Sequence, residues 1–310
     1  MRLLISGGFG YIGSHIFNEA LSRGHQVGII ARGIPEHFRY WAGGTEILLG
    51  DIREPWSFAP ATPYDCLVHL AAANDVDSRD PEEALRATAL GTRHALAFCE
   101  RQGIGRLILF STTQVYGAAT GEIPETLAPT PLNDYGLTHW FAEEYVRAWS
   151  RNGILNHVIL RPANLYGAPL HAAVDRWSLV PGCFCQEARQ TGTITLRSSG
   201  RQLRDFVNVL AVAGATLDVA ERFEAHAHRT YNLCSGQTVS IREVAELVSD
   251  VYRRRYARSC TVTCLSDEPR TAETYRISPD ALRAAGLDVM KYPSMEEEII
   301  KTFTTLEEKG

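Results

Sequence analysis

Residues 3–13 read LLISGGFGYIG, an apolar run followed by glycines at positions 7, 10 and 13. A turn without Cβ atoms lets the backbone approach a pyrophosphate closely. An amphipathic stretch at residues 12–23 follows at once, and the free N–H groups at the start of such a helix stabilise an anion. The stretch therefore predicts a strand–turn–helix unit that binds a dinucleotide.

The next 150 residues or so alternate apolar runs with segments of helical period. We predict strands at residues 3–6, 27–31, 46–49, 66–70, 107–110 and 158–160, and helices at 12–23, 81–101 and 136–151. Strands that are apolar throughout and alternate with helices indicate a parallel sheet covered on both faces. We expect an α/β fold, a Rossmann-type doubly wound parallel sheet with a smaller α/β C-terminal lobe for the substrate.

This alternation stops after Tyr166. Residues 167–204 read as mixed segments with Pro and Gly, and a strand at 230–233 and helices at 240–252 and 279–286 follow. We predict that residues 1–165, with a return segment at about 205–235, form the dinucleotide-binding domain. Residues 166–204 and 236–310 would form the substrate-binding lobe.

The composition excludes several classes of protein. With 45% hydrophobic and 22% charged residues, the 310-residue chain has an ordinary globular balance. The net charge of −5 argues against nucleic acid or an anionic membrane as the main partner, and no apolar run approaches the roughly 20 residues that span a bilayer. The seven cysteines include no C-x-x-C pair, which predicts reduced thiols in a cytoplasmic protein and no metal site.

Further motifs follow the glycine turn in order. They are Gly50-Asp51-Ile52, His69-Leu70-Ala71-Ala72, Ser111-Thr112-Thr113-Gln114-Val115-Tyr116-Gly117, Tyr135-Gly136-Leu137-Thr138-His139, Arg161-Pro162-Ala163-Asn164-Leu165-Tyr166-Gly167, Arg204-Asp205-Phe206-Val207 and Tyr231-Asn232-Leu233-Cys234-Ser235-Gly236. Over nearly its whole length the chain resembles the extended short-chain dehydrogenase/reductase family. The resemblance is to its NAD-dependent epimerase/dehydratase type, which acts on sugar nucleotides.

The resemblance implies a nicotinamide dinucleotide coenzyme. The residues that it assigns to this coenzyme are Gly7, Phe9, Gly10, Tyr11, Ile12, Gly13, Arg32, Asp51, Ile52, Leu70, Ala71, Ala72, Tyr135, His139 and Pro162. In NAD-dependent members an acidic residue ends the second strand and binds the ribose diol, whereas this chain has Ala31-Arg32 there. A guanidinium pairs with a 2′-phosphate, so we expect NADP(H) rather than NAD(H), unless Arg32 is only a solvated loop residue.

The resemblance also implies that Tyr135 exchanges a proton with the substrate oxygen and that Thr112 assists it. The family has a lysine four residues after this tyrosine, and here that residue is His139. Tyr135 and His139 share a helix face at this spacing. Histidine is largely uncharged at neutral pH, so Tyr135 should be harder to ionise than its family counterparts.

This substitution favours one chemistry over another. Reducing a ketone needs a protonated tyrosine, whereas the first step of an epimerase needs a tyrosinate base. We therefore expect an enzyme that reduces a nucleotide-linked keto-sugar. A sugar-nucleotide C4-epimerase that retains its coenzyme, and a catalytically impaired dinucleotide-binding protein, stay open. Thr113-Gln114 replaces the Asp-Glu pair of the dehydratases, which disfavours dehydration.

The predicted substrate contacts come from both halves of the chain. By resemblance, the residues that contact the substrate are Thr112, Thr113, Tyr135, Asn164, Arg204 and Arg270. The last three would bind a diphosphate, where two guanidiniums provide charge-assisted bonds. An ion pair of Arg204 with Asp205 or another acid is the alternative. The helices at 81–101 and 136–151 correspond to the pair through which relatives dimerise, so we expect a homodimer.

Overall fold

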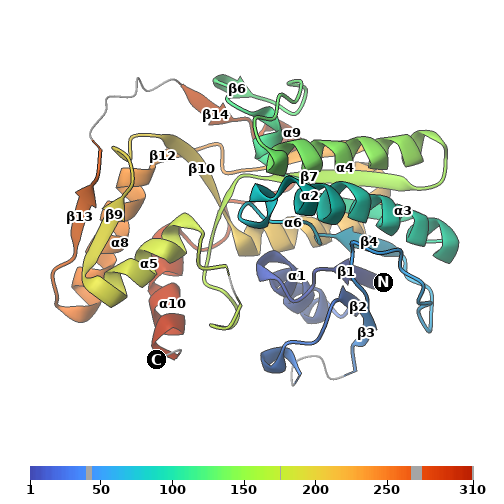
Figure 1. The fold of residues 1–310 in the computed structure, drawn as a ribbon, viewed down its shortest axis with the longest axis horizontal. Coiled ribbons are helices and arrows are strands. Elements are labelled where there is room, and N and C mark those ends of the chain that lie inside the picture. Colours follow the sequence, from blue (N-terminus) through green and yellow to red (C-terminus); the bar gives the residue numbers. More distant parts are fainter. Residues whose placement is uncertain (40–43, 175, 267–273, 309–310) are drawn as a thin grey trace.

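The structure is a computed structural model that describes residues 1–39, 44–174, 176–266 and 274–308. Its centre is a sheet of seven strands, all parallel (Figure 1). The strands are β1 (Arg2–Ser6), β2 (Gln26–Ala31), β3 (Glu46–Leu49), β4 (Cys66–His69), β5 (Arg106–Phe110), β7 (Asn156–Pro162) and β11 (Arg229–Leu233). Their order is β11-β7-β5-β4-β1-β2-β3, which confirms the predicted doubly wound sheet.

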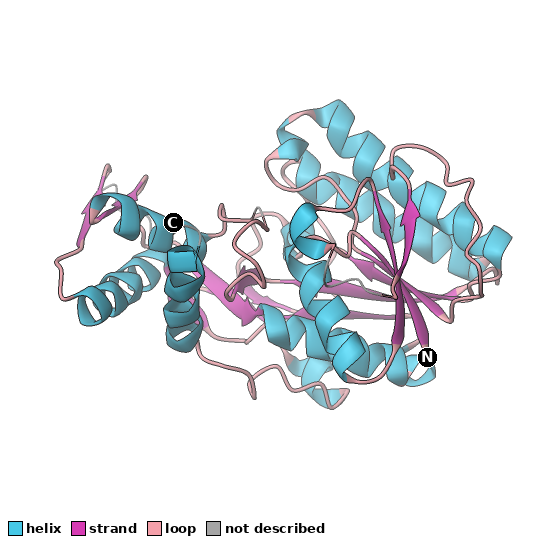
Figure 2. Cartoon of the chain, turned by 90° about the horizontal axis from the view of Figure 1, so that it is seen from below, coloured by secondary structure: helices cyan, strands magenta, loops and turns pink. Residues whose placement is uncertain are grey.

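Helices cover both faces of this sheet (Figure 2). On one face, α1 (Tyr11–Ser22) packs against α6 (Val209–Glu221). On the other lie α2 (Pro81–Ala84), a π-helical turn η3 (Leu85–Leu90), α3 (Gly91–Gln102) and α4 (Asp134–Arg151). Alternate residues of β1 enter the two separate apolar cores, as a sheet buried on both faces requires. The strand order reverses between β1 and β4, and ligands of such sheets bind outside the strands' carboxyl ends there.

A second group of elements lies at one end of the sheet (Figure 1). Its helices are α5 (Val180–Thr191), α8 (Ile241–Tyr256) and α10 (Met295–Glu308), and its strands are β8 (Asn164–Tyr166), β9 (Thr193–Leu196), β10 (Leu203–Asn208), β12 (Thr238–Ser240) and β13 (Thr261–Cys264). The three helices share an apolar core with β9 and β10. The remaining elements are β6 (Gly121–Ile123), β14 (Tyr275–Ile277), α7 (Phe223–His226), α9 (Asp280–Ala284) and the 3₁₀ turns η1 (Glu36–Phe38), η2 (Asp77–Arg79) and η4 (Thr113–Tyr116). The predicted domain boundaries stay a prediction.

Several helices differ from the sequence prediction. The helix expected at 81–101 is interrupted by the π-helical turn η3, and α5 lies in the segment read as mixed. The sequence gives no helical period for α6 because nearly every one of its residues is buried, so it has no polar face. Helix α10 was missed although Ser294 and Glu297 form a capping pair at its start.

Within the described ranges, no helix is long and apolar enough to cross a membrane, and no group of three or more candidate ligands could hold a metal ion. The seven cysteines all belong to the described part of the chain and are free thiols.

Candidate active site

The glycine turn after β1 opens a helix whose start is left free. Gly7 has a φ of +76°, and a Cβ on Gly13 would lie 2.2 Å from the carbonyl oxygen of Gly7. No side chain caps helix α1 at Gly10, whereas Asn133 caps α4. The turn therefore leaves the first amides of α1 available to an anion, which fits the pyrophosphate of a dinucleotide.

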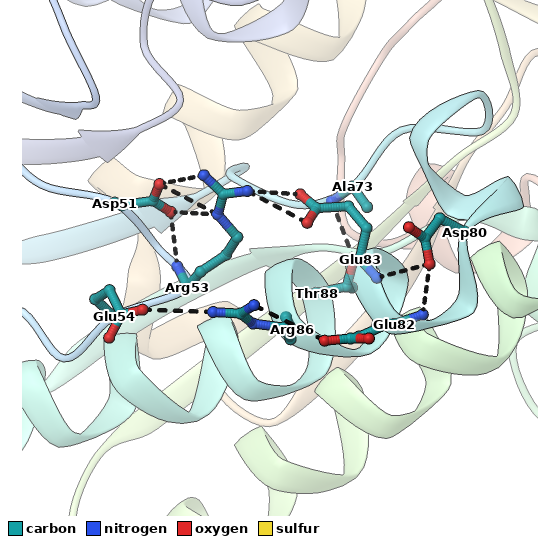
Figure 3. Close-up of polar contacts among 9 residues, drawn as sticks. All are labelled: Asp51, Arg53, Glu54, Ala73, Asp80, Glu82, Glu83, Arg86 and Thr88. Atoms are coloured by element: carbon teal, nitrogen blue, oxygen red, sulfur yellow. Dashed lines mark hydrogen bonds and ion pairs between the residues drawn. The ribbon is translucent and has the colours of Figure 1, made fainter.

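Charged side chains cluster beyond the end of β3 (Figure 3). Arg53 lies between Asp51 and Glu83, with an Nη2–Oδ2 distance of 2.6 Å to Asp51 and an Nη1–Oε2 distance of 3.3 Å to Glu83. The bonds from Arg53, together with the charge of exposed Arg32, lower the pKa of Asp51 to about 2. Arg53 thus holds the carboxylate of Asp51, which the resemblance assigns to the coenzyme, and the carbonyl oxygen of Ile52 contacts His94 Nδ1 at 3.0 Å.

A cleft of about 350 Å³ joins the glycine turn to the predicted catalytic tyrosine. It brings together predicted coenzyme and substrate residues from five parts of the chain, namely Gly7, Gly10, Tyr11, Ile12, Gly13, Leu70, Ala72, Thr112, Thr113, Tyr135, His139, Pro162 and Asn164. Phe9, Arg32, Asp51, Ile52 and Ala71 are not among its lining residues. Phe9 packs on Phe38 with ring centroids 4.9 Å apart, and the Ala71 amide donates to Ser6 Oγ at 3.3 Å.

Tyr135 stands in the first turn of α4, beside Thr112. The Thr112 hydroxyl accepts from the amide of Gln114 at 3.2 Å, which fixes the side chain at the start of η4. Burial raises the pKa of Tyr135, and the hydrogen bond with Thr112 opposes this rise. The phenol is therefore held in its protonated form at neutral pH, as the sequence predicts.

His139 is buried one turn further along α4. Its Nδ1 is 2.7 Å from the carbonyl oxygen of Tyr135, and because a carbonyl only accepts, Nδ1 carries the proton. Burial lowers the pKa of His139, so the ring is neutral at neutral pH and its Nε2 is an acceptor. The ring centroids of Tyr135 and His139 are 4.5 Å apart. This histidine cannot provide the positive charge that a lysine would.

A buried ionic network, which the sequence analysis did not identify, supports α4 below these residues. Glu143 accepts from Arg161 Nε and Nη2 at 2.8 and 2.6 Å and from Ser111 Oγ at 2.6 Å. Arg161 also donates to Tyr116 Oη at 2.6 Å. Two charges this deeply buried need such complete pairing. These bonds connect α4, which carries Tyr135, to β7 and to the residue that follows β5.

The predicted diphosphate contacts are only partly together. Asn164 donates to the carbonyl oxygen of Asp205 at 3.0 Å and lines the cleft. Arg204 lines an adjoining cavity of about 680 Å³, which shares Thr113 and Asn164 with the cleft. Arg204 forms no ion pair with an acid among the described residues, and it donates to the carbonyl oxygen of Leu203. Asp205 instead accepts from the amides of Ser235 and Gly236. Arg270 lies outside the described residues.

The structure also shows an ion pair in the cleft that the sequence motifs did not predict. Arg176, in the segment between β8 and α5, lines the cleft and forms an ion pair with Asp75, at 2.7 Å between Nη2 and Oδ1. Asp75 follows β4 and also lines the cleft. The sequence offered no signal for Arg176 because the segment that carries it has no periodicity.

The start of this segment is anchored to two helices. Tyr11 Oη donates to the carbonyl oxygen of Gly167 at 2.8 Å, and His15 Nε2 lies 3.2 Å from that of Ala168. The amide of Ala168 donates to Glu298 Oε2 of α10 at 2.9 Å. Helix α1 thus holds both Gly167 and Ala168, and the C-terminal helix holds Ala168 as well.

Comparison with known proteins agrees with this geometry. The model of the NAD dependent epimerase/dehydratase family matches residues 3–234. The chain belongs to this family. The protein is therefore an enzyme, and its coenzyme is a nicotinamide dinucleotide.

Individual relatives are similar over most of their length. A GDP-6-deoxy-D-mannose reductase of Pseudomonas aeruginosa is 29% identical over 81% of this chain and 80% of the relative. A UDP-glucose 4-epimerase of Rhizobium leguminosarum bv. trifolii is 25% identical over 82% and 83%. The crystal structure of a Thermus thermophilus UDP-glucose 4-epimerase in complex with NAD has a TM-score of 0.79, with 24% identity and 99% of each chain covered.

Proposed function

We propose that this protein is an NADP(H)-dependent ketoreductase that acts on a nucleotide-linked keto-sugar. The observation that carries the proposal is the state of the reactive pair in the cleft. Tyr135 is held protonated and His139 is buried and neutral, so the site is suited to giving a proton rather than taking one. The similarity to a reductase of a GDP-linked sugar supports the same direction.

The chain's own residues account for the proton in this reaction. When bound, the reduced nicotinamide supplies a hydride to the carbonyl carbon. Tyr135 gives its phenolic proton to the carbonyl oxygen, which becomes the new hydroxyl, and the tyrosinate recovers a proton from solvent. The Thr112 hydroxyl, beside Tyr135, hydrogen-bonds the same oxygen. Asn164 and Arg204 contact the diphosphate.

The preference for NADP(H) rests on Arg32 at the end of β2. This side chain is exposed, and its charge acts on Asp51 across the adenine end of the site. Asp51 is already bound by Arg53, so the guanidinium of Arg32 is not needed to neutralise it. Arg32 is therefore suited to a 2′-phosphate.

The test is a coenzyme balance with the purified protein. NADPH and a nucleotide-linked 4-keto-sugar are mixed, and absorbance at the nicotinamide band is compared with product formation. One NADPH consumed for each hydroxyl formed is the expected result. Interconversion of sugar epimers without net NADPH consumption would identify an epimerase. Binding of both ligands without turnover between pH 6 and 9 would overturn the enzymatic proposal.

We also propose a cytoplasmic homodimer joined through the helices predicted at 81–101 and 136–151, which are α2, η3 and α3 on one side and α4 on the other. Residues of η3 and α4 line a groove of about 680 Å³ whose exposed side chains include Leu85, Leu90, Phe141 and Tyr145. An exposed apolar patch of this kind commonly marks an interface. Light scattering should give twice the chain mass for the wild type, and Phe141→Glu should give the monomer. A monomeric wild type would contradict this assignment.

A further inference from the structure

Three charged or ionisable groups meet in the cleft from three separate segments. Tyr135 belongs to α4, Asp75 to the segment after β4, and Arg176 to the segment between β8 and α5. All three line the same cleft, and the ion pair between Arg176 and Asp75 closes at 2.7 Å. Arg176 is half-buried, so its guanidinium is partly removed from water and its charge is less screened.

The charges of Arg176 and Asp75 act on the pKa of Tyr135 with opposite signs. Burial raises the pKa of the phenol, the positive charge of Arg176 lowers it, and the negative charge of Asp75 raises it. His139 is neutral, and burial lowers the pKa of its neighbour His69 to about 4.

The remaining charge on the same helix face is already matched. Glu143 of α4 is paired with Arg161 and Arg147, at Oε2–Nη2 distances of 2.6 and 2.8 Å. Arg176 is thus the cation whose charge acts on Tyr135 among the described residues.

We propose that Arg176, held in the cleft by Asp75, supplies the positive charge that His139 does not supply to Tyr135. This inference rests on the proposed ketoreductase function. After Tyr135 has given its proton to the carbonyl oxygen it is an anion, and a guanidinium in the same low-dielectric cleft stabilises that anion. Arginine stays charged at every working pH, so this assistance does not titrate.

The ion pair itself provides a test with opposite signs. Arg176→Gln and Asp75→Asn break the same bond but remove opposite charges. If the ion pair only held the segment in place, both variants would shift the pKa of the Tyr135 phenol in the same direction. If Arg176 acts by its charge, the phenol becomes harder to ionise in Arg176→Gln and easier in Asp75→Asn.

The measurement uses 3,5-difluorotyrosine placed at position 135 in the full-length protein. The fluorine atoms acidify this one phenol and report its ionisation by ¹⁹F NMR, so no turnover is required. The expected order of midpoint pH is Asp75→Asn below wild type and Arg176→Gln above it, with Arg176→Lys close to wild type. Unchanged midpoints, or a shift of both charge-removing variants in one direction, would overturn the inference.

Turnover provides the second measurement. Arg176→Gln should lower kcat for keto-sugar reduction about 10-fold, because a preorganised charge beside the developing anion is lost. Adding His139→Lys to Arg176→Gln should restore much of this loss, and a further loss would contradict the role of charge. A wild type that reduces no keto-sugar would refute the proposed function, while the fluorine midpoints would still decide whether Arg176 acts on Tyr135.

Discussion

The two ends of the cleft offer different kinds of group to a ligand. At the glycine turn the binding groups are backbone amides, which are placed by the turn geometry of Gly7 and Gly13. At the reactive end they are the side chains of Tyr135, His139 and Arg176, which come from two separate segments. Backbone groups depend on a local pattern, whereas the electrostatics of side chains depend on what the rest of the chain places nearby. The first end is therefore easy to predict, whereas the second depends on contacts between distant segments.

Replacing the reactive phenol should have the largest effect. Tyr135→Phe removes the proton donor and should lower kcat about 1000-fold. Coenzyme affinity, measured by titration calorimetry, should change little because the glycine turn is untouched. Tyr145→Phe, on the exposed side of the same helix, is the matched control and should keep wild-type kcat. Retention of more than a tenth of the activity in Tyr135→Phe would exclude Tyr135 as the donor.

A methyl group at the other end should act on binding instead. Gly13→Ala places a Cβ against the carbonyl oxygen of Gly7, so the turn must shift, and we expect about a 100-fold loss of NADPH affinity. In Gly105→Ala the new Cβ meets nothing within 4 Å, so its affinity should equal that of the wild type. Equal affinities in the two variants would show that the turn does not hold the pyrophosphate.

Reversing the charge at the end of β2 should change which coenzyme is preferred. Arg32→Asp loses a charge-assisted pair with the 2′-phosphate and gains a carboxylate for the ribose diol. The ratio of kcat/KM for NADPH to that for NADH should fall about 30-fold. Arg258→Asp makes the same change of net charge at an exposed residue that follows α8, and it should leave the ratio unchanged. A wild type that prefers NADH would refute the assignment of Arg32.

The smallest expected effect comes from restoring an ammonium beside the phenol. His139→Lys should raise kcat at pH 7 about 3-fold, because a cation eases the departure of the phenolic proton. The gain is modest because Arg176 already supplies a charge. It should be larger in the Arg176→Gln background. A drop in kcat for His139→Lys alone would mean that the neutral ring, with its hydrogen bond to the carbonyl of Tyr135, has a function of its own.

Much of the sheet and part of the site could be predicted because they depend on local pattern. Apolar runs marked all seven central strands, and the spacing of Tyr135 and His139 placed both on one face of α4. Helix α6 could not be predicted because it is buried on nearly all sides and has no periodic polar face. The neutral state of His139 was expected from its type, and burial strengthens it.

The rest of the site depends on contacts between distant segments. Arg176 meets Asp75 across a hundred residues of sequence, and Glu143 is paired with Arg161 between a helix and a strand. Nothing in the neighbourhood of these residues along the chain indicates such a partner. A motif reveals the residues that a family shares. A positive charge that replaces that of the family lysine can come from any segment that the fold brings close to Tyr135.

The anchored start of the segment that carries Arg176 has a mechanical consequence. Tyr11 and His15 of α1, together with Glu298, fix Gly167 and Ala168 by hydrogen bonds. Any shift of α1 would therefore act on the start of this segment, eight residues before Arg176. The helix that follows the glycine turn is thereby connected by hydrogen bonds to the start of the segment that carries Arg176.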